Sequence, residues 1–197
     1  MKKTHRTVVF TVVTMSILSI LVILSFYSMT KNGQSQSDDT PKTEVEKLVK
    51  KDIESNYPGT PREVLKLYCR ITQCLYNDEM TEEQFEQLAD QLRLLFDDKL
   101  LENNESESHK KNLLADITSY HDNEERISSY DVQLDSDTKY GTIKKEKYAT
   151  LKISFLIQKS GSKKSLTKTY EEFLLRKSKD GRWKILNWQL TSGEDLE

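Results

Sequence analysis

Residues 60–76, TPREVLKLYCRITQCLY, carry the clearest helix signal in this chain. Thr60 is a typical helix N-cap residue, Pro61 fits the first helical position, and Glu63 stands three residues beyond the cap, within reach of the cap's own amide. Apolar side chains then recur on one face at helical spacing: Val64, Tyr68, Ile71 and Leu75. The stretch therefore predicts an amphipathic helix that covers a core with one side.

Further helices are predicted on either side of this one. Thr81 and Gln84 form a second capping-box pattern at the head of residues 81–101, TEEQFEQLADQLRLLFDDKLL. A weaker helical pattern follows at residues 109–120, and residues 43–53 have the apolar spacing of a short helix.

From Arg126 onward the apolar period changes to two, which predicts strands. The predicted strands cover residues 130–134, 148–159, 166–177 and 183–190, and the Asp180-Gly181 pair is a hairpin signal. Because the helices come first and the strands follow, the predicted class is α+β, with two or three helices packed on a curved antiparallel sheet of about four strands.

This order of elements resembles the cone-shaped fold of the nuclear transport factor two-like superfamily. The closing hairpin has the pattern Lys-Asp-Gly-x-Trp-x-Ile, which this superfamily often shows, at residues 179–185. More narrowly, residues 57–78, 95–104 and 127–132 look like an uncharacterised family of membrane-anchored extracytoplasmic proteins from anaerobic Gram-positive bacteria. That resemblance covers most of residues 50–190, and it implies a location and a fold but no activity.

The N-terminal region predicts a membrane anchor. Residues 8–29 carry no charge and would span about 33 Å as a helix, which matches the hydrocarbon core of a bilayer. Lys2, Lys3 and Arg6 precede this run, so the N-terminus is expected in the cytoplasm. A cleaved signal peptide is the alternative, but the run is long for one and lacks a small-x-small cleavage pattern.

The predicted organisation therefore has four parts. Residues 1–7 form a cytoplasmic tip, residues 8–29 a single-pass anchor in the cell membrane, and residues 30–42 a flexible stalk. Residues 43–197 form the extracytoplasmic cone-like domain. Without Lys2, Lys3 and Arg6 the chain has 27 basic against 32 acidic residues, a balance that disfavours nucleic acid as a partner.

The candidate ligand pocket consists of aromatic residues. Tyr68 on the opening helix, Tyr130 on the first strand and Trp188 on the last strand are expected to face inward. Cone-fold enzymes, by the resemblance, pair a Tyr donor with an Asp or His base in the cavity. No inward Asp or His is evident here, and four residues remain as sources of polar cavity groups: Glu171, Glu172, Asn187 and Gln189.

No metal site or cofactor is expected. Residues 135–146 resemble a calcium loop in part, but Lys139 occupies a ligand position and the Gly falls one place late. We therefore assign no catalytic, metal-binding or cofactor-binding residue.

The last predicted strand is apolar on both sides. Trp188 lies on one side, and Trp183 with Ile185 lies on the other, so one side is free to contact another envelope protein or a second copy through the sheet face. The sequence thus favours a noncatalytic binding or protein-interaction module at the outer face of a bacterial cell membrane. The alternatives are an assembly component of a secretion- or conjugation-type envelope complex and, third, a cavity enzyme of isomerase or dehydratase type.

Overall fold

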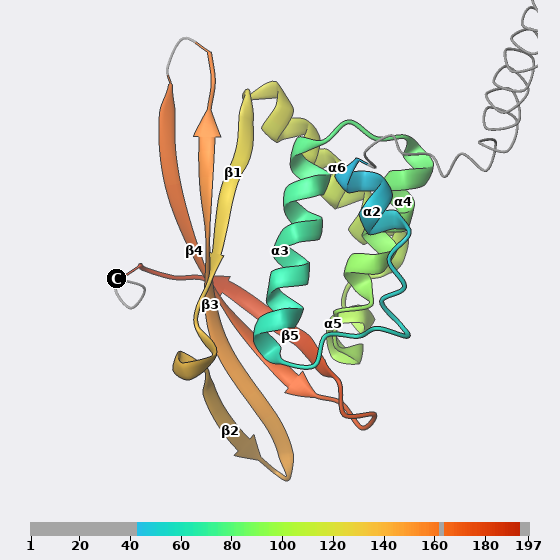
Figure 1. Cartoon of the computed structure of the whole chain (residues 1–197), viewed down its shortest axis with the longest axis vertical. Helices are drawn as coiled ribbons and strands as arrows, with labels where there is room; N and C mark the ends of the chain where they lie inside the picture. Colours follow the sequence, from blue (N-terminus) through green and yellow to red (C-terminus); the bar gives the residue numbers. More distant parts are fainter. Residues whose placement is uncertain (1–42, 162–163, 194–197) are drawn as a thin grey trace, which may run out of the picture. The chain divides into compact units, whose positions relative to one another are not determined.

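The computed structural model describes residues 43–161 and 164–193, which belong to one unit of the chain (Figure 1). Within this part the fold is α+β, with helices first and an antiparallel sheet after them, as predicted. The helices are α2 (Glu44–Val49), α3 (Pro61–Asn77), α4 (Glu82–Arg93), α5 (Asp98–Glu102) and α6 (Ser106–Asp122). The strands are β1 (Glu125–Val132), β2 (Lys139–Ile143), β3 (Glu146–Lys159), β4 (Ser165–Lys177) and β5 (Trp183–Leu190), with a 3₁₀ turn at Asp135–Asp137.

Both predicted capping boxes are present. The amide of Glu63 donates to Thr60 Oγ1 at 3.2 Å, and the amide of Thr60 donates to Glu63 Oε2 at 3.0 Å. Thr81 and Gln84 exchange the same pair of bonds at the start of α4, at 3.2 and 2.9 Å. Each box satisfies amides that the first turn of a helix leaves without a helical partner, so both helix starts are fixed by local sequence.

The sheet has the order β1-β3-β4-β5 and is antiparallel throughout. The long strand β3 pairs along its second half with β1 and along its first half with β2. Strand β2 is not among the four predicted strands, and all five of its residues are exposed without apolar alternation. Lys144 and Lys145 close the β2–β3 hairpin with φ angles of 50° and 72°.

The helices lie on one face of the sheet, with α3 nearest to the strands (Figure 1). The inward residues of β3 are all buried, as the period-two pattern predicts: Ala149, Leu151, Ile153, Phe155 and Ile157. They form one hydrophobic core with the buried faces of α3 and α4. The core therefore occupies the space between the sheet and the helices.

The predicted single helix over residues 81–101 is interrupted at residues 94–97. α4 ends at Arg93, and α5 begins at Asp98 after a short link. The backbone of this link pairs with β5, since the amide of Ile185 donates to the Leu95 carbonyl and the amide of Asp97 donates to the Ile185 carbonyl, both at 2.8 Å. Asp97 is the N-cap of α5, and its Oδ1 accepts from the amide of Lys99 at 3.0 Å.

A bulge in β5 changes which side chains share a face. Leu175 pairs with Ile185 but Phe173 pairs with Trp188, so the register shifts by one residue between them. Since side chains alternate strictly in a regular strand, this extra residue brings Trp188 to the same face as Ile185. The sequence predicts that Trp188 lies on the opposite side of β5 from Trp183 and Ile185. In the structure all three side chains lie on the inward side.

Side chains of α3 cover the edge of β1. Asn77 Nδ2 donates to the Ile127 carbonyl at 2.7 Å, and Asn77 Oδ1 accepts from the Ile127 amide at 2.9 Å. Gln73 also donates to the Ile127 carbonyl, and Arg62 donates to the Gln133 carbonyl. These polar side chains take up hydrogen-bonding groups that an edge strand otherwise leaves open.

None of the helices in residues 43–161 and 164–193 combines the length and apolarity needed to cross a membrane. The predicted tip at residues 1–7, anchor at 8–29 and stalk at 30–42 lie outside the described residues.

Candidate functional site

An apolar groove lies where the C-terminal end of α3, the start of α4 and the C-terminal half of α6 meet. It has a volume of about 650 Å³. Its apolar lining consists of Leu75, Met80, Phe85, Leu114 and Ile117. Leu114 is 52% exposed although it belongs to this lining, so the groove offers apolar surface to a partner.

The rim of this groove is acidic. Asp78, Glu79 and Glu82 belong to its lining, and no Lys or Arg is among the described residues that line it. His121 also belongs to the lining, but its Nε2 is within 2.8 Å of the Tyr76 carbonyl. The groove therefore combines an apolar floor with a negatively charged border.

The sequence contained one signal for this groove that the prediction did not use. Leu113 and Leu114 are consecutive in α6, and successive helical residues point about 100° apart, so only one of them can face the core fully. Leu113 packs against the core, and Leu114 is the exposed one.

Two of the three predicted pocket residues lie together. The ring centroids of Tyr68 and Trp188 are 6.1 Å apart, and both rings contact Phe173, at 5.1 and 5.6 Å. Phe173 and Trp188 are stacked, with an interplanar angle of 11°. Tyr68 is buried, whereas Trp188 is 38% exposed, so this group of rings reaches the surface at β5.

Glu171 lies next to these rings. It pairs with Ile153 on β3 and with Leu190 on β5, and Ile153 is fully buried on the helix-facing side of the sheet. Its Oε2 is buried and has no hydrogen-bond partner among the described residues. Burial raises the pKa of Glu171 to about 7.

The groups that face Glu171 come from two helices. Burial is the main cause that raises the pKa of Tyr68 and Cys69 on α3, and the negative charge of Glu171 adds to both shifts. The same charge contributes to the raised pKa of Tyr76 on α3 and of Tyr120 on α6. The sequence predicts four residues as possible polar cavity groups, and Glu171 is the one of the four that lies beside these rings.

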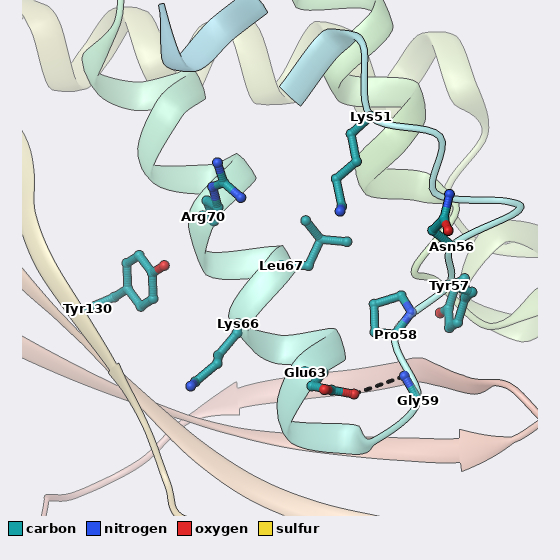
Figure 2. A pocket seen from close by; sticks show the side chains of 10 residues that line it. All are labelled: Lys51, Asn56, Tyr57, Pro58, Gly59, Glu63, Lys66, Leu67, Arg70 and Tyr130. Carbon is teal, nitrogen blue, oxygen red and sulfur yellow. Dashed lines mark hydrogen bonds between the residues drawn. The ribbon is translucent and has the colours of Figure 1, made fainter. Parts of the chain in front are cut away.

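Tyr130 lies in different surroundings from Tyr68 and Trp188. It lines a groove of about 510 Å³ between α3 and the loop that precedes it, where it lies beside Arg70 (Figure 2). Arg70 already donates to Glu44 at 2.5 Å, and that hydrogen bond is the main cause of the lowered pKa of Glu44. Glu63 is occupied by the α3 cap, as Figure 2 shows for its bond to Gly59.

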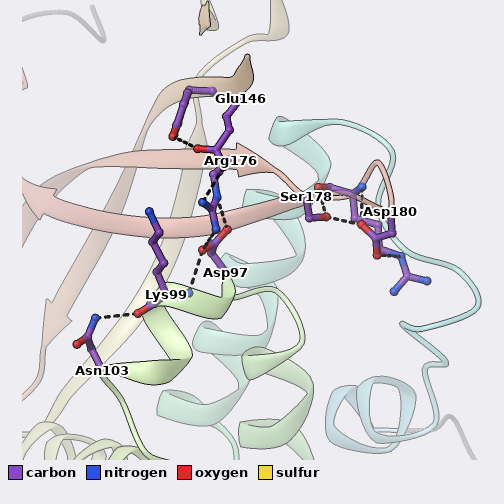
Figure 3. Close-up of polar contacts among 9 residues, drawn as sticks. Asp97, Lys99, Asn103, Glu146, Arg176, Ser178 and Asp180 are labelled. Atoms are coloured by element: carbon purple, nitrogen blue, oxygen red, sulfur yellow. Dashed lines mark hydrogen bonds and ion pairs between the residues drawn. The ribbon is translucent and has the colours of Figure 1, made fainter. Parts of the chain in front are cut away.

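A second polar region surrounds Arg176 on β4. Its guanidinium donates to Asp97 from Nε at 2.9 Å and from Nη2 at 2.7 Å, and it also contacts Glu146 at 3.2 Å (Figure 3). The Asp97 and Arg176 side chains are 2% and 14% exposed. This pair joins the α4–α5 link to β4, which indicates a structural role.

Trp183 and Ile185, the predicted interaction face, lie inside the domain. Trp183 is 7% exposed, with its ring 5.8 Å from that of Tyr140, and Ile185 is fully buried. No surface formed by these two side chains is available on the domain as described.

The fold and these surfaces define a class: an α+β domain with helices on one face of an antiparallel sheet and an apolar groove among the helices. The chain belongs to the family described as Domain of unknown function (DUF6715), whose model matches residues 1–188. No curated protein matches the chain. The resemblance to the cone-shaped superfamily and to membrane-anchored bacterial proteins stays a prediction.

Two solved structures are similar at a low level. One is CagV, a VirB8 homologue of the type IV secretion system from Helicobacter pylori strain 26695, with 12% identity, coverage of 66% of this chain and 97% of that chain, and a TM-score of 0.38. The other is the intermembrane space region of the chloroplast protein ARC6, with 11% identity, coverage of 69% and 100%, and a TM-score of 0.33. Likeness at this level carries no argument about what the chain does.

Proposed function

We propose that this protein is a noncatalytic protein-interaction module, tethered through residues 8–29 to the outer face of a bacterial cell membrane. Its partner is another envelope protein, which inserts a basic amphipathic helix into the groove between α3, α4 and α6. The observation that carries this proposal is the pairing of an exposed apolar lining with a wholly acidic set of charged rim residues.

The chemistry of the groove specifies the occupant. An amphipathic helix presents apolar side chains at three- and four-residue spacing, and these can fill the space over Leu114 and Met80. Lys or Arg beside that apolar stripe can approach Asp78, Glu79 and Glu82, which have no cation among the described residues of the groove lining. Such rim charges chiefly increase the association rate and select the partner's sign, while the apolar contacts supply most of the affinity.

A photo-crosslinking residue at position 114 of the full chain tests the proposal in the cells that express it. The crosslinked segment, mapped by mass spectrometry, is expected to be a basic amphipathic stretch of another envelope protein. The matched control places the same residue at Leu166 on β4, which is 66% exposed, and should not yield that product. Glu79→Lys with Glu82→Lys should reduce the yield at position 114.

Three outcomes contradict the proposal. They are the absence of any product at position 114, a product with a second copy of this chain, and a product with a segment that is acidic or not amphipathic.

A narrower candidate makes the partner part of a secretion- or conjugation-type envelope complex. It is supported by the predicted layout of a cytoplasmic tip, one span and one extracytoplasmic domain, which resembles that of bitopic assembly factors of such systems. Identification of the crosslinked partner decides it, because a protein outside such a complex rules this version out.

A further inference from the structure

We infer that a second site exists on the inner face of the sheet, where Glu171, Tyr68, Phe173 and Trp188 bind the primary ammonium group of an alkylamine. We call these four residues the aromatic–carboxylate cluster. They are distinct from the residues of the α3–α4–α6 groove, so this inference does not depend on the proposed function.

The described residues leave one oxygen of the Glu171 carboxyl group without a hydrogen-bond partner. This oxygen is Oε2, and it is buried. A buried carboxylate is stable only when a charge or donors compensate it. Burial raises the pKa of Glu171, and no ion pair between described residues involves this carboxylate. An ammonium ion would bring both the charge and three donors.

The surrounding rings fit the same ligand. Trp188 is the diagonal neighbour of Glu171 across the β4–β5 pair, since Glu171 pairs with Leu190 and Phe173 pairs with Trp188. Aromatic faces attract cations, Trp most strongly, and the attraction is larger where water is excluded. Trp188 is partly exposed and Leu190 is 76% exposed, so the cluster borders on solvent at β5.

Other ligands fit less well. A divalent metal needs several oxygen or nitrogen ligands, and residues 43–161 and 164–193 contain no group of three or more His, Cys, Asp or Glu able to hold one. A neutral alcohol could donate one hydrogen bond to Glu171 but would gain nothing from the ring faces. The cluster therefore selects an organic cation.

Calorimetric titration of the full chain in detergent micelles with n-butylammonium chloride tests the inference. The titration is run at pH 8, where the Glu171 carboxylate is ionised and the amine is protonated. Saturable binding is expected, with an affinity that falls about tenfold or more in Glu171→Gln, because that variant keeps the shape and removes the charge. Glu172→Gln is the matched control, since Glu172 pairs with Lys152 and Gln189 on the opposite face.

Two further probes make the result specific. n-Butanol should bind at least tenfold more weakly than n-butylammonium, and N-acetyl-lysine amide should bind if the natural source of the ammonium is a lysine side chain. Trp188→Leu should weaken n-butylammonium binding even if Glu171→Gln fails to fold. Absence of saturable binding, equal binding of n-butanol, or equal loss in Glu172→Gln would each overturn the inference.

Discussion

Asp97 accepts two hydrogen bonds from Arg176 across 79 residues of sequence, at 2.9 and 2.7 Å. The same carboxylate caps α5 through the Lys99 amide, and the backbone of Asp97 pairs with β5. One residue thus connects a helix start, β4 and β5, which explains why the carboxylate is 2% exposed yet satisfied.

Replacement of Arg176 should destabilise the domain strongly. Arg176→Met is expected to lower the free energy of unfolding by about 3 kcal/mol, because it leaves the Asp97 carboxylate buried without its opposite charge. Urea unfolding followed by tryptophan fluorescence measures this. Asp97→Asn added to Arg176→Met should recover part of the loss, since Asn still caps α5. Lys47→Met is the control, because its ion pair with Glu44 is exposed, and its loss should stay below about 1 kcal/mol.

The link between Asn77 and β1 can be tested by hydrogen exchange. Asn77→Ala removes the acceptor of the Ile127 amide and one donor to the Ile127 carbonyl, so that amide should exchange faster and stability should fall by about 1–2 kcal/mol. Asn77→Asp keeps the acceptor and loses the donor, and it should retain protection of the Ile127 amide. Unchanged exchange in Asn77→Ala would show that the contact is not formed in solution.

The raised pKa of Glu171, about 7, predicts a loss of stability with rising pH. The folded state holds the Glu171 proton more tightly than the unfolded state does, so this stabilisation is complete below about pH 4 and disappears as pH rises through about 7. Between pH 5 and pH 8 the free energy of unfolding should fall by on the order of 2 kcal/mol more in the wild type than in Glu171→Gln.

Comparison with Glu171→Gln is needed because His109 acts in the opposite direction. Burial lowers the pKa of His109, so its contribution is lost as pH falls. The two chains share His109, and the difference between their pH profiles isolates Glu171. Parallel profiles would contradict the prediction.

Two substitutions in the β2–β3 turn should increase the stability of the domain. Lys144 and Lys145 both have positive φ, which costs residues with a side chain and is favoured by Asn and Gly at these two positions. Lys144→Asn with Lys145→Gly should raise the free energy of unfolding by about 1 kcal/mol and the thermal midpoint by a few degrees. Lys147→Asn, one residue inside β3, changes the charge without touching the turn and should not stabilise the chain.

Local signals predicted the parts of the fold that local contacts determine. The capping boxes at Thr60 and Thr81 and the inward face of β3 follow from spacing within a few residues, and all three are confirmed. The break after α4 could not be found in this way. The helical pattern continues through this link, and Arg176, the buried partner of Asp97, is distant in sequence.

Tyr68 and Trp188, two of the residues assigned to the candidate pocket, have ring centroids 6.1 Å apart. The β5 bulge that places Trp188 on the same face as Ile185 leaves no mark in the sequence pattern. Tyr130 lines a different groove, because β1 is positioned by hydrogen bonds from the polar face of α3. Leu114 was missed because a short run of two leucines does not reveal which one is exposed.

The hydrogen bonds that α3 donates to β1 also bear on self-association. Proteins held on a surface meet their own copies at high local concentration. Two sheets then associate most readily through edge strands whose N–H and C=O groups are unpaired. In this domain the Ile127 amide and carbonyl are already occupied by Asn77, so β1 cannot serve as a template along that part of its length. A chain tethered as proposed would therefore be protected from edge-to-edge joining at this part of β1.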